Sequence, residues 1–214
     1  RDLVEPEESA NDADDAGRFR LAPYMDQILA SPTHPRYLGG YVQLGTEVAA
    51  DDFERCVDAF RTGEVAPFQG RGDRFARLIA ESTWGLQIAT AKKILPSLPG
   101  MQAALEGGGS VLEVGCGTAN FLVQIAKAFP NARPLGVDID PVLIAAAEAD
   151  APGPFYLVGD LAGFDLPSTA PQEFDAILSA GNVVAFLHPD TRVPALAGLA
   201  SRLVPSGRVV IGFG

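Results

Sequence analysis

Residues 110–121 read Ser-Val-Leu-Glu-Val-Gly-Cys-Gly-Thr-Ala-Asn-Phe, and this stretch decides the fold. The apolar residues around Glu113 predict a short buried strand. Gly115 and Gly117 follow at once, where the chain must turn sharply, and residues 120–129 then carry apolar side chains at helical spacing. A strand, a glycine turn and a helix in this order are typical of the first unit of a nucleotide-binding βαβ fold.

The residues of this turn favour some ligands over others. A dinucleotide-binding turn follows the pattern G-x-G-x-x-G and holds a pyrophosphate at the helix N-terminus. Here Asn120 stands where the third glycine belongs, and the acid Glu113 precedes the first glycine. A carboxylate would repel a pyrophosphate, but it would attract an ammonium group or accept hydrogen bonds. A tight turn that holds no ligand is the alternative at this stage.

The region after the hinge at Gly107–Gly109 alternates predicted strands and helices, which indicates a doubly wound parallel α/β sheet, a Rossmann-like fold. Asp140 and Pro141 suit the start of one of its helices, as N-cap and first-turn residue. The strands are expected at 110–115, 134–138, 155–158, 174–179 and 208–213, and the helices at 120–129, 140–149 and 191–203.

The carboxyl ends of parallel strands form the ligand edge of such a sheet. Asp138 ends the second predicted strand, about 20 residues beyond the glycine turn, where a ribose-binding acid belongs. Asp160 follows the third strand, and Ser179 ends the fourth, with Asn182 close behind. Each residue alone is weak evidence, because a lone acid after a strand is often a helix cap. Their order and spacing carry the argument.

The run from Glu113 to Ala119 resembles motif I of the class I S-adenosylmethionine (SAM)-dependent methyltransferases, which reads acid-x-G-x-G-x-G. It departs from that motif at Ala119, which replaces a glycine. Residues 174–179 and 203–208 are similar to the family's fourth strand and its Leu-x-Pro-Gly-Gly turn, with Ser206 replacing a glycine. The resemblance covers residues 105–214, and residues 22–100 more loosely.

The resemblance implies SAM as cofactor and methyl transfer to a small-molecule acceptor as the reaction. Asp138 would bind the ribose hydroxyls, Ile139 would lie on the adenine face, and Asp160 with the Leu161 amide would bind the adenine edge. The implied cofactor-binding residues are Glu113, Gly115, Cys116, Gly117, Asp138, Ile139, Asp160, Leu161 and Ser179. Asn182 is expected to touch the acceptor. No catalytic residue is assigned, because His188 and His34 both read more simply as loop histidines.

Residues 22–100 predict a helical linker or lid, with helices at 24–30, 38–44, 51–60 and 73–95. The runs 37–41, 59–63 and 66–68 are similar to the linker of those methyltransferases that carry an N-terminal winged-helix domain. That similarity implies that Tyr37 and Trp84, and with them Tyr41 and Phe68, face the substrate. Aromatic residues spaced along helices are also common in a plain core, which is the alternative.

Residues 1–21 are acidic and admit two interpretations: a disordered acidic segment, or the wing remnant of a winged-helix domain with strands at 3–5 and 17–21. The winged-helix resemblance implies a homodimer through the N-terminal region. The family's sheet has two further strands beyond the five expected in 101–214. We therefore expect the chain to be a fragment, with a C-terminally incomplete SAM-binding domain.

The composition limits the classes of partner that we expect the protein to bind. The net charge of −11 disfavours nucleic acid as substrate. The sequence shows no signal peptide and no apolar run of about 20 residues, so we expect no membrane contact. The two cysteines form no disulfide framework and no metal cluster, and a reducing cytoplasm is the expected location. A non-catalytic SAM- or nucleotide-binding regulatory module remains the alternative function, and an NAD-dependent Rossmann oxidoreductase a weaker one.

Overall fold

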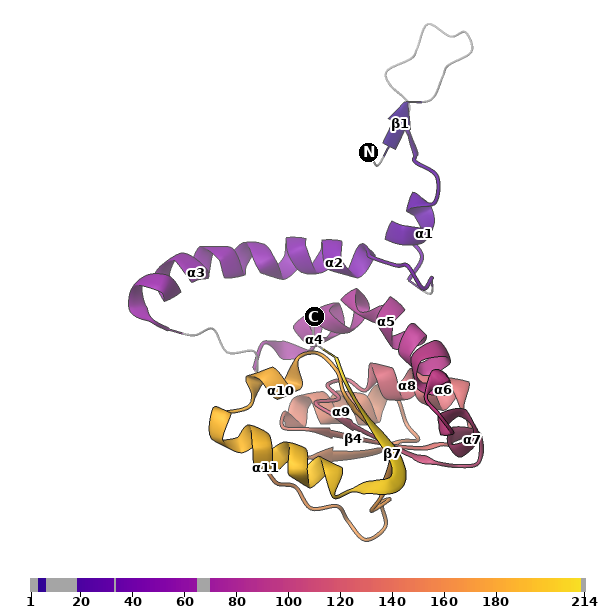
Figure 1. The fold of residues 1–214 in the computed structure, drawn as a ribbon. Helices are drawn as coiled ribbons and strands as arrows, with labels where there is room; N and C mark the ends of the chain where they lie inside the picture. Colours follow the sequence, from indigo (N-terminus) through magenta and orange to yellow (C-terminus); the bar gives the residue numbers. More distant parts are fainter. Residues whose placement is uncertain (1–3, 7–18, 33, 65–69, 213–214) are drawn as a thin grey trace, which may run out of the picture.

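The computed structural model describes residues 4–6, 19–32, 34–64 and 70–212. Its centre is a parallel sheet in the order β5-β4-β3-β6-β7 (Figure 1). The strands are β3 (Ser110–Val114), β4 (Arg133–Asp138), β5 (Phe155–Val158), β6 (Phe174–Ser179) and β7 (Leu203–Ile211). The predicted doubly wound parallel α/β sheet, preceded by helices, is confirmed.

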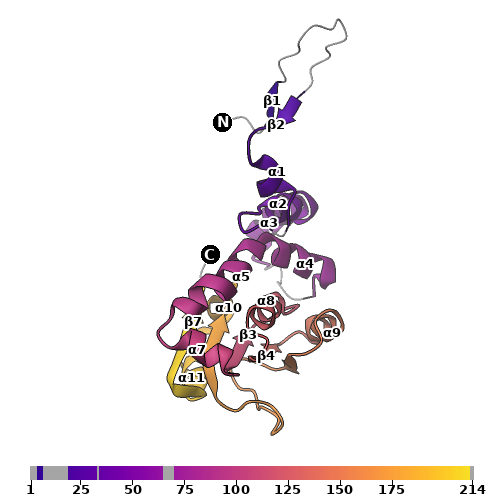
Figure 2. The same ribbon diagram turned by 90° about the vertical axis from the view of Figure 1, so that its right-hand side faces the viewer.

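Helices cover both faces of the sheet (Figure 2). On one face lie η2 (Thr90–Ile94), α6 (Leu95–Ser97), α7 (Met101–Glu106), α8 (Asn120–Ala128) and α9 (Pro141–Asp150). The other face packs against α11 (Pro189–Ala200) and the segment 161–170. Alternate residues of β3 serve the two layers, since Val111 lies in the first core and Leu112 and Val114 lie in the second.

The register of the strands places their carboxyl ends together. Val114 at the end of β3 pairs with Val137 of β4 on one side and with Ser179 of β6 on the other. From β3 the chain moves outward to β4 and β5, and it then returns to β6 on the other side of β3. The strand order therefore reverses between β3 and β6, the position at which open α/β sheets bind ligands.

Before the sheet come α1 (Met25–Leu29), α2 (Gly39–Leu44), η1 (Gly45–Ala49), α3 (Ala50–Thr62), α4 (Gly72–Ser82) and α5 (Trp84–Ala89). The helices expected at 38–44 and 51–60 are joined through the π-helical turn η1 into one continuous stretch, so neither Asp51 nor Asp52 is an N-cap. Gly40 lets α2 lie directly on α4, because a Cβ there would come within 2.5 Å of the Ser82 backbone nitrogen.

The prediction of a single helix over residues 73–95 is wrong. The structure divides it at Thr83, where α4 ends and α5 begins. The Ser82 and Thr83 hydroxyls both donate hydrogen bonds to the Ile79 carbonyl oxygen, at 2.7 and 3.1 Å. Side-chain hydroxyls that bond back to the preceding turn compete with regular helix geometry, which accounts for the break.

The last strand and the helix before it also differ from the expectation. The turn expected at 203–207 is instead a bulge inside β7, because Phe174 pairs with Leu203 while Ala176 pairs with Arg208. The helix expected from 191 begins at Pro189 and ends at Ala200. The short helices α7 and α10 (Val183–Phe186) were not predicted.

The strands expected near the N-terminus are present. β1 (Val4–Pro6) pairs antiparallel with β2 (Phe19–Leu21), and the residues between them lie outside the described part of the chain. The wing interpretation of this pair remains a prediction. Among the described residues, no helix is long and apolar enough to cross a membrane.

Candidate functional site

The glycine turn after β3 is fixed by the neighbouring strand. The backbone N–H groups of Gly115 and Cys116 both donate to the Val137 carbonyl oxygen of β4, at 2.7 and 3.1 Å. Gly115 and Gly117 have φ values of 67° and 54°, in the left-handed region that glycine adopts without steric penalty. A Cβ on Gly117 would meet no atom within 4 Å, so this backbone is open to a ligand.

The acid at the end of β4 holds the same turn. One oxygen of Asp138, Oδ2, accepts a hydrogen bond from the Gly117 N–H at 2.8 Å, and Oδ1 accepts one from the Asp140 N–H at 3.0 Å. Asp138 is half-buried, and each carboxylate oxygen can accept a further hydrogen bond. The expected ribose-binding acid therefore lies at the glycine turn, with room for hydroxyl donors.

Glu113 is buried behind the turn. Its side chain is 1% exposed, and Oε2 has no hydrogen-bond partner in the described structure. Burial raises the pKa of Glu113 well above its usual range; the Leu122 N–H in the first turn of α8 opposes this shift, and the negative charge of Asp138 adds to it. A positively charged group bound near Glu113 would stabilise the ionised form of its carboxyl group.

The side chain of Cys116 is buried beneath the turn. The residue is 6% exposed, and its Sγ lies 2.7 Å from the position that a Cβ on Gly136 would occupy. Burial raises the pKa of the Cys116 thiol far above its usual value, so the thiol stays protonated. The neighbouring Tyr156 donates a hydrogen bond from its hydroxyl to the Ala151 carbonyl oxygen at 2.8 Å, and burial raises its pKa to about 12.

Ala119, which replaces the motif's last glycine, adopts the conformation that glycine would. Its φ of 63° is left-handed, and it precedes the first residue of α8. The side chain is fully buried against Cys116, Leu122 and Ile144. Packing of the methyl group therefore offsets part of the backbone strain.

The residues expected to bind adenine line the same edge near β5. Ile139 is 55% exposed, as a residue available to stack on a ring must be. Asp160 is exposed. Its Oδ1 accepts a hydrogen bond from the Ala162 N–H at 2.8 Å, and this bond stabilises the turn that follows β5. Leu161 is half-buried and packs on the core of the second sheet face.

The end of β6 carries the other half of the site. Ser179 is 1% exposed, and its Oγ has no partner in the described structure. Asn182 is half-buried at the N-cap of α10 with a φ of 63°. The next residue, Val183, packs on the glycine turn: a Cβ added to Gly115 would lie 2.4 Å from Val183 Cγ2. Val183 was not among the predicted site residues, because the sequence pattern predicted no helix at 183–186.

Tyr37 and Trp84 come together in a cavity whose lining includes no residue of the glycine turn. They line one cavity of about 370 Å³, and the other lining residues are Pro32, Gln43, Arg74 and Glu81. Trp84 Nε1 is buried there with no hydrogen-bond partner in the described structure. Tyr37 is 7% exposed, Tyr41 is 53% exposed, and Phe68 lies outside the described residues.

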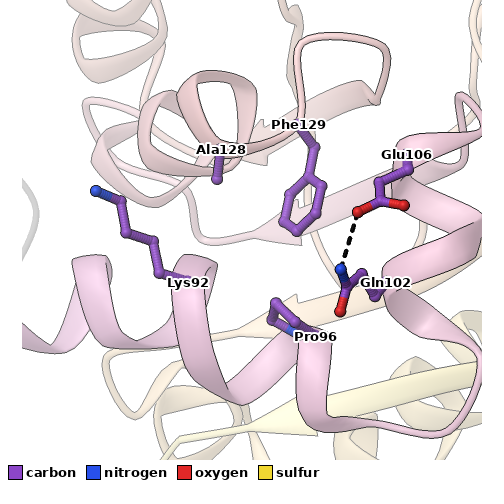
Figure 3. Close-up of a pocket in the computed structure, with 6 residues that line it drawn as sticks. All are labelled: Lys92, Pro96, Gln102, Glu106, Ala128 and Phe129. Atoms are coloured by element: carbon purple, nitrogen blue, oxygen red, sulfur yellow. Dashed lines mark hydrogen bonds between the residues drawn. The ribbon is translucent and has the colours of Figure 1, made fainter.

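Another cavity, of about 390 Å³, lies at the C-terminal end of α8, whereas the glycine turn precedes its N-terminal end (Figure 3). It is lined by Lys92, Pro96, Gln102, Glu106, Ala128 and Phe129. The Gln102 amide donates to Glu106 Oε1 at 2.9 Å along α7, on one wall of the cavity. Its lining includes none of the expected site residues.

Both histidines take part in local turns. His188 Nδ1 accepts a hydrogen bond from the Asp190 N–H at the start of α11, at 3.3 Å, and His34 Nδ1 accepts one from the Arg36 N–H, at 3.2 Å. Asp140 caps α9 as expected, because its Oδ1 accepts from the Val142 N–H at 2.8 Å. The described residues contain no group of three or more His, Cys, Asp or Glu placed to hold a metal ion.

Comparison with known proteins agrees with this geometry. Residues 111–207 match the family model described as a methyltransferase domain. A trans-aconitate 2-methyltransferase of Methylobacterium radiotolerans is 32% identical over 109 residues, which are 50% of this chain and 38% of that protein. The chain thus spans well under half the length of this curated relative.

Two solved structures share the fold over almost the whole chain. Human N-acetylserotonin methyltransferase in complex with SAM superposes with a TM-score of 0.66 at 13% identity, covering 98% of this chain and 60% of that one. An O-methyltransferase family protein from Burkholderia thailandensis gives a TM-score of 0.64 at 15% identity, with the same coverage of 98% and 60%. Residues 111–207 thus match a methyltransferase domain, and the strand order and the glycine turn with its acids are those expected of the class I SAM-dependent methyltransferase fold.

Proposed function

We propose that the chain binds SAM at the carboxyl edge of its sheet and transfers the methyl group to a small-molecule acceptor. The observation that carries the proposal is the hydrogen bond from the Gly117 N–H to Asp138, which joins the glycine turn to the acid of the next strand. Gly117 is at the same time open to a ligand, because no atom lies within 4 Å of its would-be Cβ. Both features lie at the carboxyl edge of the sheet, where an adenosyl group would bind.

The adenosyl end would be held by residues of β4 and β5. Asp138 has lone pairs free for ribose hydroxyls beyond its two backbone hydrogen bonds. The exposed Ile139 would cover one face of adenine, and Asp160 with the Leu161 amide would bind its polar edge. Asp160 keeps one carboxylate oxygen outside the bond that it accepts from Ala162.

The methionine end would lie between β3 and β6. Two buried polar atoms there, Glu113 Oε2 and Ser179 Oγ, have no partner in the described structure. Buried polar groups are normally hydrogen-bonded, so a ligand that supplies donors fits these positions. A positive charge nearby would also favour ionisation of Glu113, whose pKa burial raises.

Catalysis would rest mainly on alignment. SAM supplies a methyl group on a positively charged sulfur, which is already a good electrophile. The protein then has to orient the acceptor and exclude water. Asn182, at the end of β6, is the proposed acceptor contact nearest the cofactor edge. We assign no general base, because His34 and His188 both use Nδ1 in local turns.

The acceptor is proposed to be a small molecule for two reasons. The relatives named above act, by their names, on trans-aconitate and N-acetylserotonin. The net charge of −11 disfavours nucleic acid. Tyr37 and Trp84 are proposed to contribute to acceptor binding through their shared cavity, where the Trp84 indole N–H can donate a hydrogen bond.

Calorimetric titration with SAM, S-adenosylhomocysteine and NAD tests the proposal. We expect binding of the first two, no binding of NAD, and a loss of affinity of about tenfold or less in Asp160→Ala, whose fold should be intact because the residue is exposed. Tight NAD binding would favour an oxidoreductase. SAM binding without methyl transfer to any of a panel of phenols, amines and carboxylates would favour a regulatory module. No binding of any of the three would contradict the proposal.

A further inference from the structure

The cavity lined by Tyr37 and Trp84, which we call the Tyr37–Trp84 cavity, lies among α2, α4, α5 and the loop before α2. Its volume of about 370 Å³ falls in the range of small-molecule sites, about 300–1,000 Å³. Two close approaches fix its walls. A Cβ on Gly39 would come within 2.5 Å of Tyr37 Cε2, and a Cβ on Gly85 would collide with the Pro35 carbonyl oxygen. The Tyr37 ring and the backbone beside Trp84 are therefore held in place by the protein itself.

Arg74, the cation in the cavity lining, is already neutralised. Its Nη2 and Nε donate hydrogen bonds to Glu47 Oε1 and Oε2 at 2.6 and 2.9 Å, so both carboxylate oxygens are used. The hydrogen bonds from Arg74 hold the pKa of Glu47 below its usual range. A ligand anion that entered the cavity would have to compete with Glu47 for the same guanidinium group.

Glu81 is the charge that remains. It lies seven residues, or two helical turns, beyond Arg74 on α4, it lines the cavity, and it is half-buried. Among the described residues it has no ion-pair partner. Glu47, Arg74 and Glu81 together leave a net negative charge at the cavity, which attracts a cationic ligand and repels an anionic one.

The indole of Trp84 adds a hydrogen-bond donor and a ring face. Its Nε1 is buried with no hydrogen-bond partner in the described structure, and an indole N–H can only donate. Buried polar groups are normally hydrogen-bonded, so an oxygen acceptor on a ligand fits this position. The faces of indole and phenol rings also attract organic cations. The aromatic lining therefore adds to the preference that Glu81 sets.

We propose that the Tyr37–Trp84 cavity binds a small organic cation, an ammonium group on a short aromatic or aliphatic body that also carries a hydroxyl or carbonyl oxygen. The ammonium group pairs with Glu81, and the oxygen accepts the hydrogen bond of Trp84 Nε1. The proposal rests on the proposed function in taking this cation to be the methyl acceptor. The described lining includes no residue of the glycine turn, so the ammonium is a recognition group and not the atom that receives the methyl group. Carboxylates, trans-aconitate among them, are disfavoured in this cavity.

Calorimetric titration of the whole chain with three probes of similar shape gives the first test. The probes are tyramine, which is a cation, 4-ethylphenol, which is neutral, and 3-(4-hydroxyphenyl)propanoate, which is an anion. We expect tyramine to bind with a dissociation constant of about 1 mM or lower, 4-ethylphenol at least about tenfold more weakly, and the anion more weakly still. Trp84 is the only tryptophan in the sequence, so a change in tryptophan fluorescence on adding tyramine would place binding at the cavity. No binding of tyramine, or equal affinity for the cation and the anion, would overturn the proposal.

Variants assign the preference to single groups. Glu81→Gln should weaken tyramine binding at least about tenfold and leave 4-ethylphenol unchanged, because only the charge is removed. Glu54→Gln is the matched control, since it removes the same charge from an exposed side chain of α3 outside the cavity lining. Trp84→Phe keeps a ring but removes the donor, and it should weaken both probes by a similar factor of about three to ten. A Glu81→Gln variant that loses no more affinity than Glu54→Gln would show that Glu81 does not bind the cation.

Titration of the same proteins with SAM separates this proposal from the proposed function. Glu81→Gln should bind SAM like the wild type, because Glu81 lines a cavity that shares no residue with the glycine turn. SAM binding without tyramine binding would contradict the cation site and leave the proposed function standing. Tyramine binding without SAM binding would contradict the proposed function and leave the cation site standing.

Discussion

The Asp138 carboxylate accepts a hydrogen bond from the Gly117 N–H at 2.8 Å, across 21 positions of the sequence. Its other oxygen accepts from the Asp140 N–H. The acid that would bind a ribose is therefore also the anchor of the glycine turn. The two halves of the proposed cofactor site are aligned by the protein's own contacts, which lowers the conformational entropy that the site must lose when a ligand binds.

Asp138→Asn should lower the free energy of unfolding by about 1–3 kcal/mol, because an amide nitrogen cannot accept the hydrogen bond that a charged carboxylate now accepts. Urea denaturation followed by circular dichroism measures the change. Asp160→Asn is the control, since exposed Asp160 accepts its hydrogen bond within its own turn. Equal losses in the two variants would contradict an anchoring role for Asp138.

Gly115→Ala should be destabilising by about 2–4 kcal/mol. The added Cβ would lie 2.4 Å from Val183 Cγ2, and the φ of 67° would also be strained. In the double variant with Val183→Ala the clash is removed and the strain remains, so part of the loss should return. A double-mutant cycle of denaturation midpoints measures this coupling. Strict additivity would show that α10 does not pack on the turn.

Glu113 should make stability depend on pH. Because burial raises the pKa of Glu113 in the folded protein, the folded state binds this proton more tightly than the unfolded state. Its contribution is then fully present below the unfolded pKa and is lost as the pH rises through the folded pKa. Relative to the neutral variant Glu113→Gln, the wild type should lose stability from pH 5 upward, by at most about 1.4 kcal/mol per pH unit. Parallel stability curves for the two proteins would be the contrary result.

Cys116 should resist thiol reagents in the folded protein. It is 6% exposed, and burial raises the pKa of its thiol, so the reactive thiolate is scarce. In a Cys56→Ser background, labelling by iodoacetamide should occur only as urea unfolds the chain, and mass spectrometry should follow the unfolding curve. Fast labelling of the native variant would mean that the thiol faces the ligand edge.

The sheet could be predicted because its signals are local. Short buried apolar strands, two glycines and the Asp140 cap each fix the chain within a few positions, and the structure places them as expected. The helical region was less predictable, since the break at Thr83 depends on hydroxyl groups that bond to the preceding turn. The pattern of apolar residues continues through that break and gives no sign of it.

Parts of the candidate site could not be predicted from the sequence, because they depend on tertiary contacts. The sequence spacing indicated Asp138, but only the structure shows that its carboxylate binds the Gly117 N–H. The contact of Val183 with Gly115 had no sequence signal beyond the position of Val183 after Asn182. The cavity that joins Tyr37 to Trp84 brings together segments that pack through α2, α4 and α5.

The most direct test of the account compares two glycine variants by SAM calorimetry. Gly117 and Gly100 have φ values of 54° and 75°, and a Cβ on either would meet no atom within 4 Å. Each change to alanine should therefore be destabilising by a similar amount, about 1–2 kcal/mol. If Gly117 lies under the cofactor, Gly117→Ala should weaken SAM binding at least about tenfold while Gly100→Ala binds like the wild type. Unchanged affinity in Gly117→Ala, or equal losses in both variants, would contradict the proposed site.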